Sequence, residues 1–197
     1  IGENGCGKST LLRAMTGLDT PKKSRITLKG RALSARERIA RSALVMQDVN
    51  SQLFTDSVEE ELLLAWKGRS RREKTAGETR EKAAEEAAQR EIDTLLQALG
   101  LAECKERHPM SLSGGQKQRL ALATCLLQDA NFFYFDEPTS GLDPVSRDEM
   151  NEIFRKLAEK GGAILFSTHI TSDLEKCADT ITYIKNGELL LSAKKED

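Results

Sequence analysis

The sequence predicts an α/β fold with a central, mostly parallel sheet, because strand-like runs alternate with helical patterns along it. The strand-like runs are residues 25–29, 42–46, 132–135, 163–167 and 180–185. Residues 132–135 are four consecutive aromatic side chains, which is typical of a strand buried on both faces. The chain has 197 residues, which is enough for one well-buried domain.

The helix expected after Asp143 has Pro144 at a favourable first-turn position and should end at Gly161 and Gly162. Its apolar residues recur at helical spacing, so it should cover one face of the sheet. These residues are Met150, Ile153, Phe154 and Leu157.

The chain should end in antiparallel strands at an edge. Asn186 and Gly187 form a two-residue hairpin signal between residues 180–185 and 188–192.

An all-helical subdomain is expected to be inserted from about residue 50 to residue 125. Its start carries a capping-box pattern in residues 57–60, and a short apolar helical stripe follows in residues 92–99. Residues 67–91 are dominated by charged residues and alanine. A basic cluster within them is interleaved with glutamates, which favours a solvated helix face over a phosphate-binding surface. This cluster consists of Arg69, Arg71, Arg72 and Lys74.

The start of the chain fits the phosphate-loop pattern Gly-x-x-x-x-Gly-Lys-Ser in residues 2–9. Backbone N–H groups of such a loop surround a phosphate chain, while Lys8 reaches its outer phosphates and Ser9 offers a hydroxyl to Mg²⁺. Residues 8–16 read as a helix with Leu11, Leu12 and Met15 on one side, so the phosphates should lie at a helix N-terminus. The expected nucleotide-binding residues here are Gly2, Glu3, Asn4, Gly5, Cys6, Gly7, Lys8, Ser9 and Thr10.

The strand that should lead into this loop is not in the sequence. A phosphate loop follows a buried strand, yet only Ile1 precedes Gly2, so we expect that strand to be missing from this sequence.

Cys6 lies inside the loop and has two interpretations. It is either a reactive thiol, with its pKa lowered by the helix end and by Lys8, or a small side chain that fills a variable position.

An acidic pair ends the aromatic strand. Asp136 and Glu137 fall at the C-terminal end of residues 132–135, where open parallel sheets place their ligands. We expect Asp136 to hold Mg²⁺ largely through water, and Glu137 to orient and deprotonate the water that attacks the terminal phosphate.

A second phosphate-binding helix end is expected after Ser113, which is a natural N-cap. The glycines that follow expose N–H groups at the positive end of the helix dipole. The candidate residues are Ser113, Gly114, Gly115 and Gln116.

Taken together, these motifs resemble the nucleotide-binding subunit of an ATP-binding cassette (ABC) transporter, a P-loop NTPase. Residues 2–9 match the Walker A motif of that family, residues 112–116 its signature, and residues 132–137 its Walker B motif with the catalytic glutamate. Residues 140–143 match the D-loop, Gln47 the Q-loop glutamine and His169 the switch histidine. The family places a base-stacking aromatic residue upstream of these motifs, so adenine recognition is not represented in this sequence.

The resemblance implies an ATP hydrolase that uses Mg²⁺ and works as a head-to-tail dimer, with each ATP held between Walker A of one subunit and the signature of the other. It implies that His169 hydrogen-bonds the γ phosphate and the attacking water. It implies that Gln47 touches Mg²⁺ or water and reports γ-phosphate occupancy to the helical subdomain. Asp143, in the D-loop, is expected to contribute to the nucleotide site.

Composition limits the partners. The net charge is −1, so no global electrostatic field selects nucleic acid or anionic lipid. The sequence has no signal peptide and no run of 18 apolar residues, and its four cysteines form no Cys-x-x-Cys pair. We therefore expect a protein of the reducing cytosol that does not itself span a membrane. The resemblance implies that it is peripheral at the cytoplasmic face of the cell membrane, attached through an integral membrane subunit.

Only resemblance to known subfamilies indicates which process the ATPase powers. Residues 52–61 are similar to the segment after the Q-loop in energy-coupling-factor importer ATPases, whereas residues 169–175 and 183–187 are more similar to some exporter ATPases. A soluble family member that acts on nucleic acid or ribosomes is the other alternative, although the long coiled coils or zinc modules of DNA-repair members are missing. An importer motor is the preferred interpretation. The transported substrate is not encoded in this chain.

Overall fold

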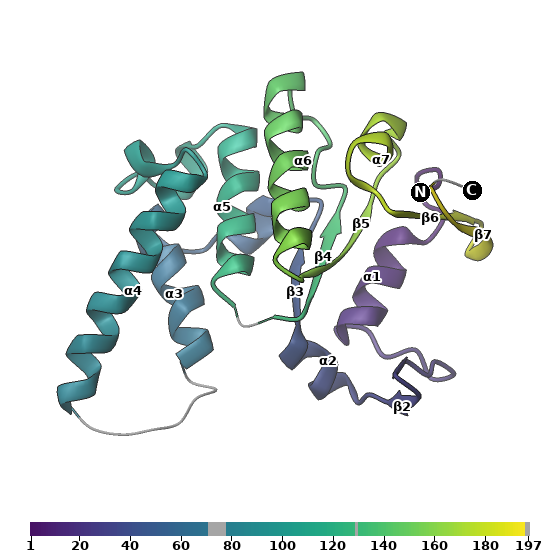
Figure 1. Cartoon of the computed structure of the whole chain (residues 1–197), viewed down its shortest axis with the longest axis horizontal. Helices are drawn as coiled ribbons and strands as arrows, with labels where there is room; N and C mark the ends of the chain where they lie inside the picture. The colour runs from purple at the N-terminus through teal and green to yellow at the C-terminus, as the bar shows by residue number, and fades with distance from the viewer. Residues whose placement is uncertain (71–77, 129, 196–197) are drawn as a thin grey trace. The chain divides into compact units, whose positions relative to one another are not determined.

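The computed structural model describes residues 1–70, 78–128 and 130–195, which form two compact units (Figure 1). One unit comprises Ile1–Gln47 and Ala130–Asp197, and the other comprises Asp48–Asp129. The basic cluster that includes Arg71 and Arg72 lies outside the residues whose side chains are described.

The first unit is built on a three-stranded parallel sheet in the order β3-β4-β5, which confirms the predicted α/β class and the parallel pairing. The strands are β3 (Ser42–Val45), β4 (Phe132–Asp136) and β5 (Ala163–Ser167). Asp136 pairs with Ser167 in register, so the C-terminal ends of β4 and β5 meet at one edge of the sheet.

Helices cover this sheet and bury its aromatic strand. Helix α1 (Lys8–Thr16) packs against β3 and β4, and α6 (Pro144–Glu159) packs against β5 and against α7 (Thr171–Cys177). Phe154 of α6 stacks on Phe135 at a centroid distance of 4.7 Å and on Phe166 at 5.9 Å. Removing one such buried ring costs about 3–5 kcal/mol, so this stack holds α6 firmly on the sheet.

The predicted apolar side of α1 is only partly buried. Leu12 is buried, but Leu11 is 40% exposed, so Leu11 does not belong to the core of this unit.

The apolar stripe predicted on α6 is confirmed. Met150 and Phe154 are buried, and Ile153 and Leu157 are half-buried.

The segment after α1 differs from the single strand expected at residues 25–29. Strands β1 (Thr27–Leu28) and β2 (Arg31–Ala32) form a short antiparallel hairpin. Its turn places Lys29 at φ 48° and Gly30 at φ 79°, which is the left-handed geometry of a two-residue hairpin turn.

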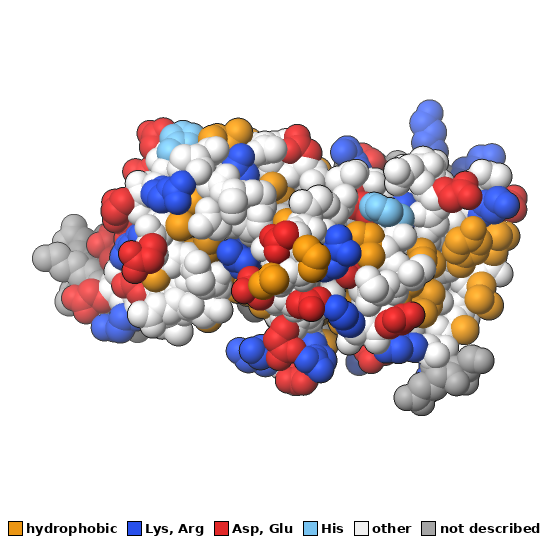
Figure 2. Space-filling model, turned by 90° about the horizontal axis from the view of Figure 1, so that it is seen from above, with side chains coloured by type: hydrophobic (Ala, Val, Ile, Leu, Met, Phe, Trp, Pro, Cys, Tyr) orange, Lys and Arg blue, Asp and Glu red, His pale blue; other side chains and the backbone are white. Residues whose placement is uncertain are grey.

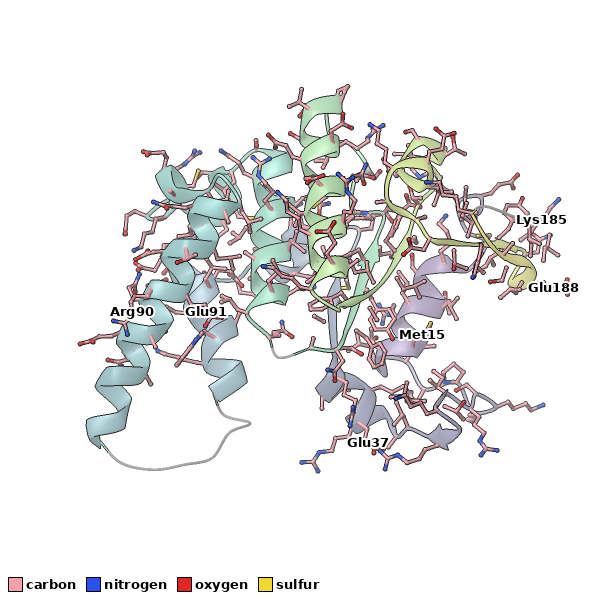
Figure 3. The ribbon with its side chains drawn as sticks, viewed as in Figure 1. Met15, Glu37, Arg90, Glu91, Lys185 and Glu188 are labelled. Atoms are coloured by element: carbon pink, nitrogen blue, oxygen red, sulfur yellow. The ribbon has the colours of Figure 1, made fainter. Side chains whose placement is uncertain are left out.

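A short helix follows that hairpin. Helix α2 (Ala35–Arg41) begins at a capping box in which Ser34 Oγ accepts a hydrogen bond from Glu37 N, and the Glu37 carboxylate accepts one from Ser34 N. Ser34 N and Ser34 Oγ both donate to the carboxylate of Glu37, which lies on α2 in Figure 3, and these two bonds lower its pKa.

The predicted C-terminal hairpin is confirmed, but it forms a two-stranded sheet of its own and is not an edge of the β3-β4-β5 sheet. Strands β6 (Thr180–Lys185) and β7 (Glu188–Lys194) are antiparallel, and Lys185 and Glu188 flank the turn (Figure 3). Asn186 and Gly187 have φ values of 51° and 80°. Three consecutive leucines of β7, residues 189–191, are exposed, and hydrophobic side chains gather on this part of the surface in Figure 2.

The second unit is helical. Its long helices are α3 (Val58–Ser70), α4 (Glu78–Ala98) and α5 (Gly114–Leu126), and α3 packs against both of the others. Among the described residues, the short 3₁₀ helix η1 (Val49–Gln52) precedes α3, while η2 (Ala102–Cys104) and η3 (Pro109–Ser111) lie between α4 and α5. Its core contains the fully buried side chains Val58, Leu62, Ile92, Leu96, Leu101, Leu120, Leu122 and Leu127.

In the described part of the chain, no helix combines the length and apolar character that crossing a membrane requires.

Candidate active site

The phosphate loop ends at the N-terminus of α1. Gly7 is the residue before the helix and has φ 107°, a left-handed conformation that glycine adopts without steric cost. Gly2 is constrained by space instead, because a Cβ there would lie 2.3 Å from the Ile184 carbonyl oxygen and 2.6 Å from Cys6 Sγ. The C-terminal hairpin therefore packs directly on the loop, and Gly187 N donates a hydrogen bond to Cys6 O at 2.9 Å.

A cavity of about 210 Å³ opens beside this loop. Its walls come from the loop, from the first turn of α1, and from the ends of two strand segments. The lining residues are Asn4, Gly5, Gly7, Lys8, Ser9, Thr10, Gln47 and Glu137. The structure thus brings the predicted phosphate loop, the predicted Q-loop glutamine and the predicted catalytic glutamate into one site.

Lys8 is the cation of this site, and its side chain is only 8% exposed. Its ammonium group donates to Gly2 O at 2.8 Å and to Glu3 O at 3.2 Å. It also lies 3.2 Å from Glu137 Oε1, in an ion pair whose two side chains are both buried. The two loop carbonyls thus hold the Lys8 ammonium group in the position where it contacts the Glu137 carboxylate.

Glu137 is held in an unusual conformation. Its φ is 51°, a left-handed geometry that costs a non-glycine residue roughly 1–3 kcal/mol. Ser167 secures it, because Glu137 N donates to Ser167 O at 3.1 Å and to Ser167 Oγ at 3.0 Å. Oε2 lies 2.7 Å from His169 Nδ1, which fixes the imidazole against the carboxylate.

The other carboxylate oxygen of Glu137 is the reactive candidate. Oε1 is buried and accepts no hydrogen bond from any described residue, although Lys8 is near enough for the ion pair. A buried acceptor at a cavity wall suits a water molecule, because burying an acceptor without a hydrogen-bond donor is unfavourable.

Asp136, the neighbour of Glu137 in the chain, is not among the residues that line the cavity. It is 7% exposed, and its Oδ1 accepts a hydrogen bond from Ser167 Oγ at 2.6 Å. Ser167 therefore contacts both members of the acidic pair. Ser167 was not among the predicted site residues, although its position two residues before His169 is a usable signal.

Some predicted nucleotide-binding residues lie away from the cavity walls. Gly2 and Glu3 face Lys8 through their carbonyl oxygens, and Cys6 is buried with 6% exposure. Asp143 caps α6, with its Oδ1 accepting hydrogen bonds from Val145 N and Ser146 N. The interactions with Ser146 lower the pKa of the Asp143 carboxyl.

The second predicted phosphate site belongs to the helical unit. Ser113 and Gln116 form a capping box at the start of α5, and Gln116 Nε2 also contacts Cys104 Sγ at 3.5 Å. Gly114 is exposed at the first position of the helix. The side chains of this motif thus complete the helix cap, and its glycine leaves the helix end open.

Comparison with known proteins agrees with this arrangement. The family model described as "ABC transporter" matches residues 1–140, which is most of the chain and includes the phosphate loop and Glu137. The chain belongs to the ABC transporter family. Its fold is accordingly that of an ABC ATPase.

ABC transporter relatives align with nearly the whole chain. A putative ABC transporter ATP-binding protein of Treponema denticola is 39% identical over 189 residues, covering 96% of this chain and 35% of that protein. The energy-coupling factor transporter ATP-binding protein EcfA2 of Streptococcus thermophilus is 30% identical over 205 residues, covering 100% of this chain and 69% of that protein. The chain thus spans about a third of the Treponema denticola protein.

Two solved ABC structures have the same fold. The structure of cbiO1 from Clostridium perfringens, part of the ABC transporter complex cbiONQ, has a TM-score of 0.80 and 27% identity, covering 98% of this chain and 75% of that chain. The ATP-binding cassette MJ0796, solved as a dimer in a post-hydrolysis state bound to ADP and Pi, has a TM-score of 0.81 and 25% identity, covering 98% and 82%.

Proposed function

We propose that this chain is the ATP-binding and ATP-hydrolysing motor of a membrane transporter. The observation that carries the proposal is the position of Glu137, which lines the cavity together with Lys8 of the phosphate loop and contacts both Lys8 and His169. This site contains an anion-binding helix end, a cation, a carboxylate base and an imidazole. These groups can bind a phosphoanhydride and activate the water that hydrolyses it.

In the proposed reaction, the N–H groups at the start of α1 and the Lys8 ammonium bind the β and γ phosphates. Binding phosphate draws Lys8 from Glu137, so the carboxylate is free to act as a base. Glu137 Oε1 then orients a water molecule and accepts its proton, while Oε2 keeps His169 in place to contact the γ phosphate.

Mg²⁺ is the expected cofactor, and the residues present fit it. Ser9 and Gln47 offer a hydroxyl and an amide oxygen at the cavity, and the Asp136 carboxylate would bind the ion through water. The described residues contain no cluster of three or more His, Cys, Asp or Glu that could hold a metal unaided. Mg²⁺ needs few protein ligands when phosphates and water complete its shell, and it neutralises the charge that develops on the phosphates.

A second ABC subunit is proposed to complete the site. The open helix end formed by Ser113, Gly114, Gly115 and Gln116 would bind the γ phosphate of an ATP held by the partner, and Asp143 would lie at the dimer contact. The dimeric MJ0796 cassette bound to ADP and Pi supports a dimer. The partner is either a second copy of this chain or a related ABC subunit.

Import is the transport direction that the relatives favour. EcfA2 is named as an energy-coupling factor transporter ATP-binding protein, and a putative HMP/thiamine import ATP-binding protein of Bacillus subtilis is 34% identical over 184 residues. The cbiO1 neighbour is part of a transporter complex. We therefore propose an importer of the energy-coupling-factor type, with this chain peripheral at the cytoplasmic face and bound to an integral membrane subunit.

The segment after Gln47 presents one aromatic side chain to solvent. Phe54 is 75% exposed, whereas its neighbour Leu53 is buried at 7%. Leu53 is therefore part of the buried core, and of these two apolar side chains only Phe54 is exposed to a partner. Glu61 of α3 fixes the loop, because its Oε2 accepts hydrogen bonds from Phe54 N at 2.9 Å and from Thr55 N at 3.0 Å.

Replacing Phe54 with Ala should therefore uncouple ATP hydrolysis from transport and weaken copurification with the membrane subunit. The ring is largely in water already, so the melting temperature should change little. Leu53→Ala is the matched control, because truncating a buried leucine costs about 2–5 kcal/mol and should lower the melting temperature clearly.

Transport into proteoliposomes, ATPase rate and melting temperature should be measured together. A large loss of thermal stability in Phe54→Ala would assign the ring to the core. Specific retention of the protein on ribosomes or DNA, with no membrane subunit recovered, would contradict the transporter proposal. Transport out of the cell would assign the motor to an exporter.

A further inference from the structure

A buried carboxylate outside the cavity joins two parts of the active site. Asp173 of α7 is 1% exposed. Its Oδ2 accepts a hydrogen bond from Thr139 Oγ1 at 2.6 Å, and its Oδ1 accepts one from Asn151 Nδ2 at 3.1 Å. Thr139 and Asn151 are themselves buried, at 1% and 4% exposure.

The position of this cluster relative to the site is informative. Thr139 follows Glu137 by two residues, in a turn closed by hydrogen bonds from Ser140 N to Glu137 O and from Leu142 N to Thr139 O. Asp173 follows His169 by four residues, at the start of α7. The 2.6 Å bond therefore ties the turn that carries Glu137 to the segment that carries His169.

The third member anchors both segments to α6. Asn151 lies in the middle of α6, the helix that Asp143 caps. The Cys177 thiol donates to Asp173 O at 3.1 Å and lies 3.6 Å from Asn151 Oδ1. Burial raises the pKa of this thiol to about 11, so it remains a protonated donor at neutral pH.

We propose that Asp173 is a positioning residue, which holds the Glu137–Asp143 turn and the His169 segment in one fixed relation for ATP hydrolysis. The inference rests on the proposed function, because it assumes that Glu137 and His169 act on one phosphate. Asp173 touches none of the cavity-lining residues in the described contacts, so it acts through Thr139 and through the α7 backbone.

Physical chemistry favours positioning over simple packing. Burying a carboxylate against uncharged donors is costly, and apolar side chains would fill the same space with less desolvation. Hydrogen bonds are directional, however, so they fix the relative placement of two segments more narrowly than apolar contacts do. A displacement of about 1 Å in a reacting group can lower a rate by as much as 100-fold.

The test compares Thr139→Val with Thr139→Ser in the assembled protein. Valine removes the hydroxyl at nearly constant volume, and serine keeps it. We expect Thr139→Val to lower kcat by about tenfold with KM for ATP little changed, and Thr139→Ser to remain close to wild type. Asp173→Ala breaks this bond and also the one from Asn151, so its loss should be at least as large. Adding Thr139→Val to it should cause no further loss, because the Thr139–Asp173 bond is already broken.

A purely structural role would give a different pattern. Leu96→Ala, in the core of the helical unit, serves as the control that lowers the melting temperature without touching the cluster. If Thr139→Val behaves like this control, losing stability while kcat is retained, the inference is overturned. Additive losses in the double variant would overturn it as well.

The proposed function and this inference fail in different ways. Hydrolysis that survives Glu137→Gln would overturn the proposed function and the inference together. Hydrolysis that depends on Glu137 but is unaffected by Thr139→Val would overturn the inference alone.

Discussion

Replacing Glu137 with Gln should lower ATP hydrolysis at least about 100-fold, which corresponds to about 2.7 kcal/mol of transition-state stabilisation. The amide has nearly the shape of the carboxylate and its oxygen can still accept from His169 Nδ1, so the site should stay assembled. The amide cannot take a proton from water. ATP should therefore remain bound, and an ATP-bound dimer should accumulate.

The measurements are steady-state ATPase rates and size-exclusion chromatography with Mg-ATP. Glu188→Gln is the matched control, because it neutralises an exposed carboxylate on β7 and should leave the rate unchanged. Wild-type turnover by the Glu137→Gln protein would remove Glu137 from proton transfer. Loss of ATP binding would show instead that its ion pair with Lys8 is needed to build the loop.

Replacing Gly114 with Asp should abolish dimer closure without affecting nucleotide binding at the phosphate loop of the same chain. A Cβ at Gly114 meets no described heavy atom within 4 Å, so the side chain fits the single subunit. A negatively charged side chain in the first turn also interacts favourably with the positive end of the helix dipole, so the substitution should not destabilise α5. The carboxylate would repel the partner's γ phosphate by roughly 4 kcal/mol at about 4 Å and an effective dielectric near 20, about a thousandfold in affinity.

Gly114→Asn separates charge from bulk, since it places a neutral side chain of the same shape at the helix end. Dimerisation should be followed by sedimentation in the Glu137→Gln background, where ATP stays bound, and nucleotide affinity by a fluorescent ATP analogue. Equal losses for Asn and Asp would point to steric blockage. If the Asp variant no longer binds nucleotide as a single subunit, the helix end serves its own chain.

Elements defined by local patterns could be predicted with little error. Helix α1 and strands β5 and β6 have the predicted bounds, because apolar periodicity and the flanking glycines or turns specify them locally. The β1–β2 hairpin was missed, since each strand has two residues and Lys29-Gly30 is a weaker turn signal than Asn186-Gly187. The capping box that opens α2 was readable from the sequence but went unused.

The candidate site divides in the same way. Residues within one motif could be located because neighbours in the sequence are also neighbours in space, so their spacing along the chain determines their relative positions. Ser167, by contrast, reaches Asp136 across 31 positions, and Asp173 reaches Thr139 across 34. Such contacts depend on the pairing of β4 with β5 and on the placement of α7, and a single sequence does not specify these distances.

The contact between the last hairpin and the phosphate loop has a practical consequence for engineering this motor. Ile184 O fills the space that a side chain at Gly2 would need, and Gly187 N bonds to Cys6 O. The stiffness of the ATP-binding loop is thus set partly by a turn about 180 positions downstream. A chimera that exchanges this hairpin would retune nucleotide affinity even if every recognised ATPase motif were copied unchanged.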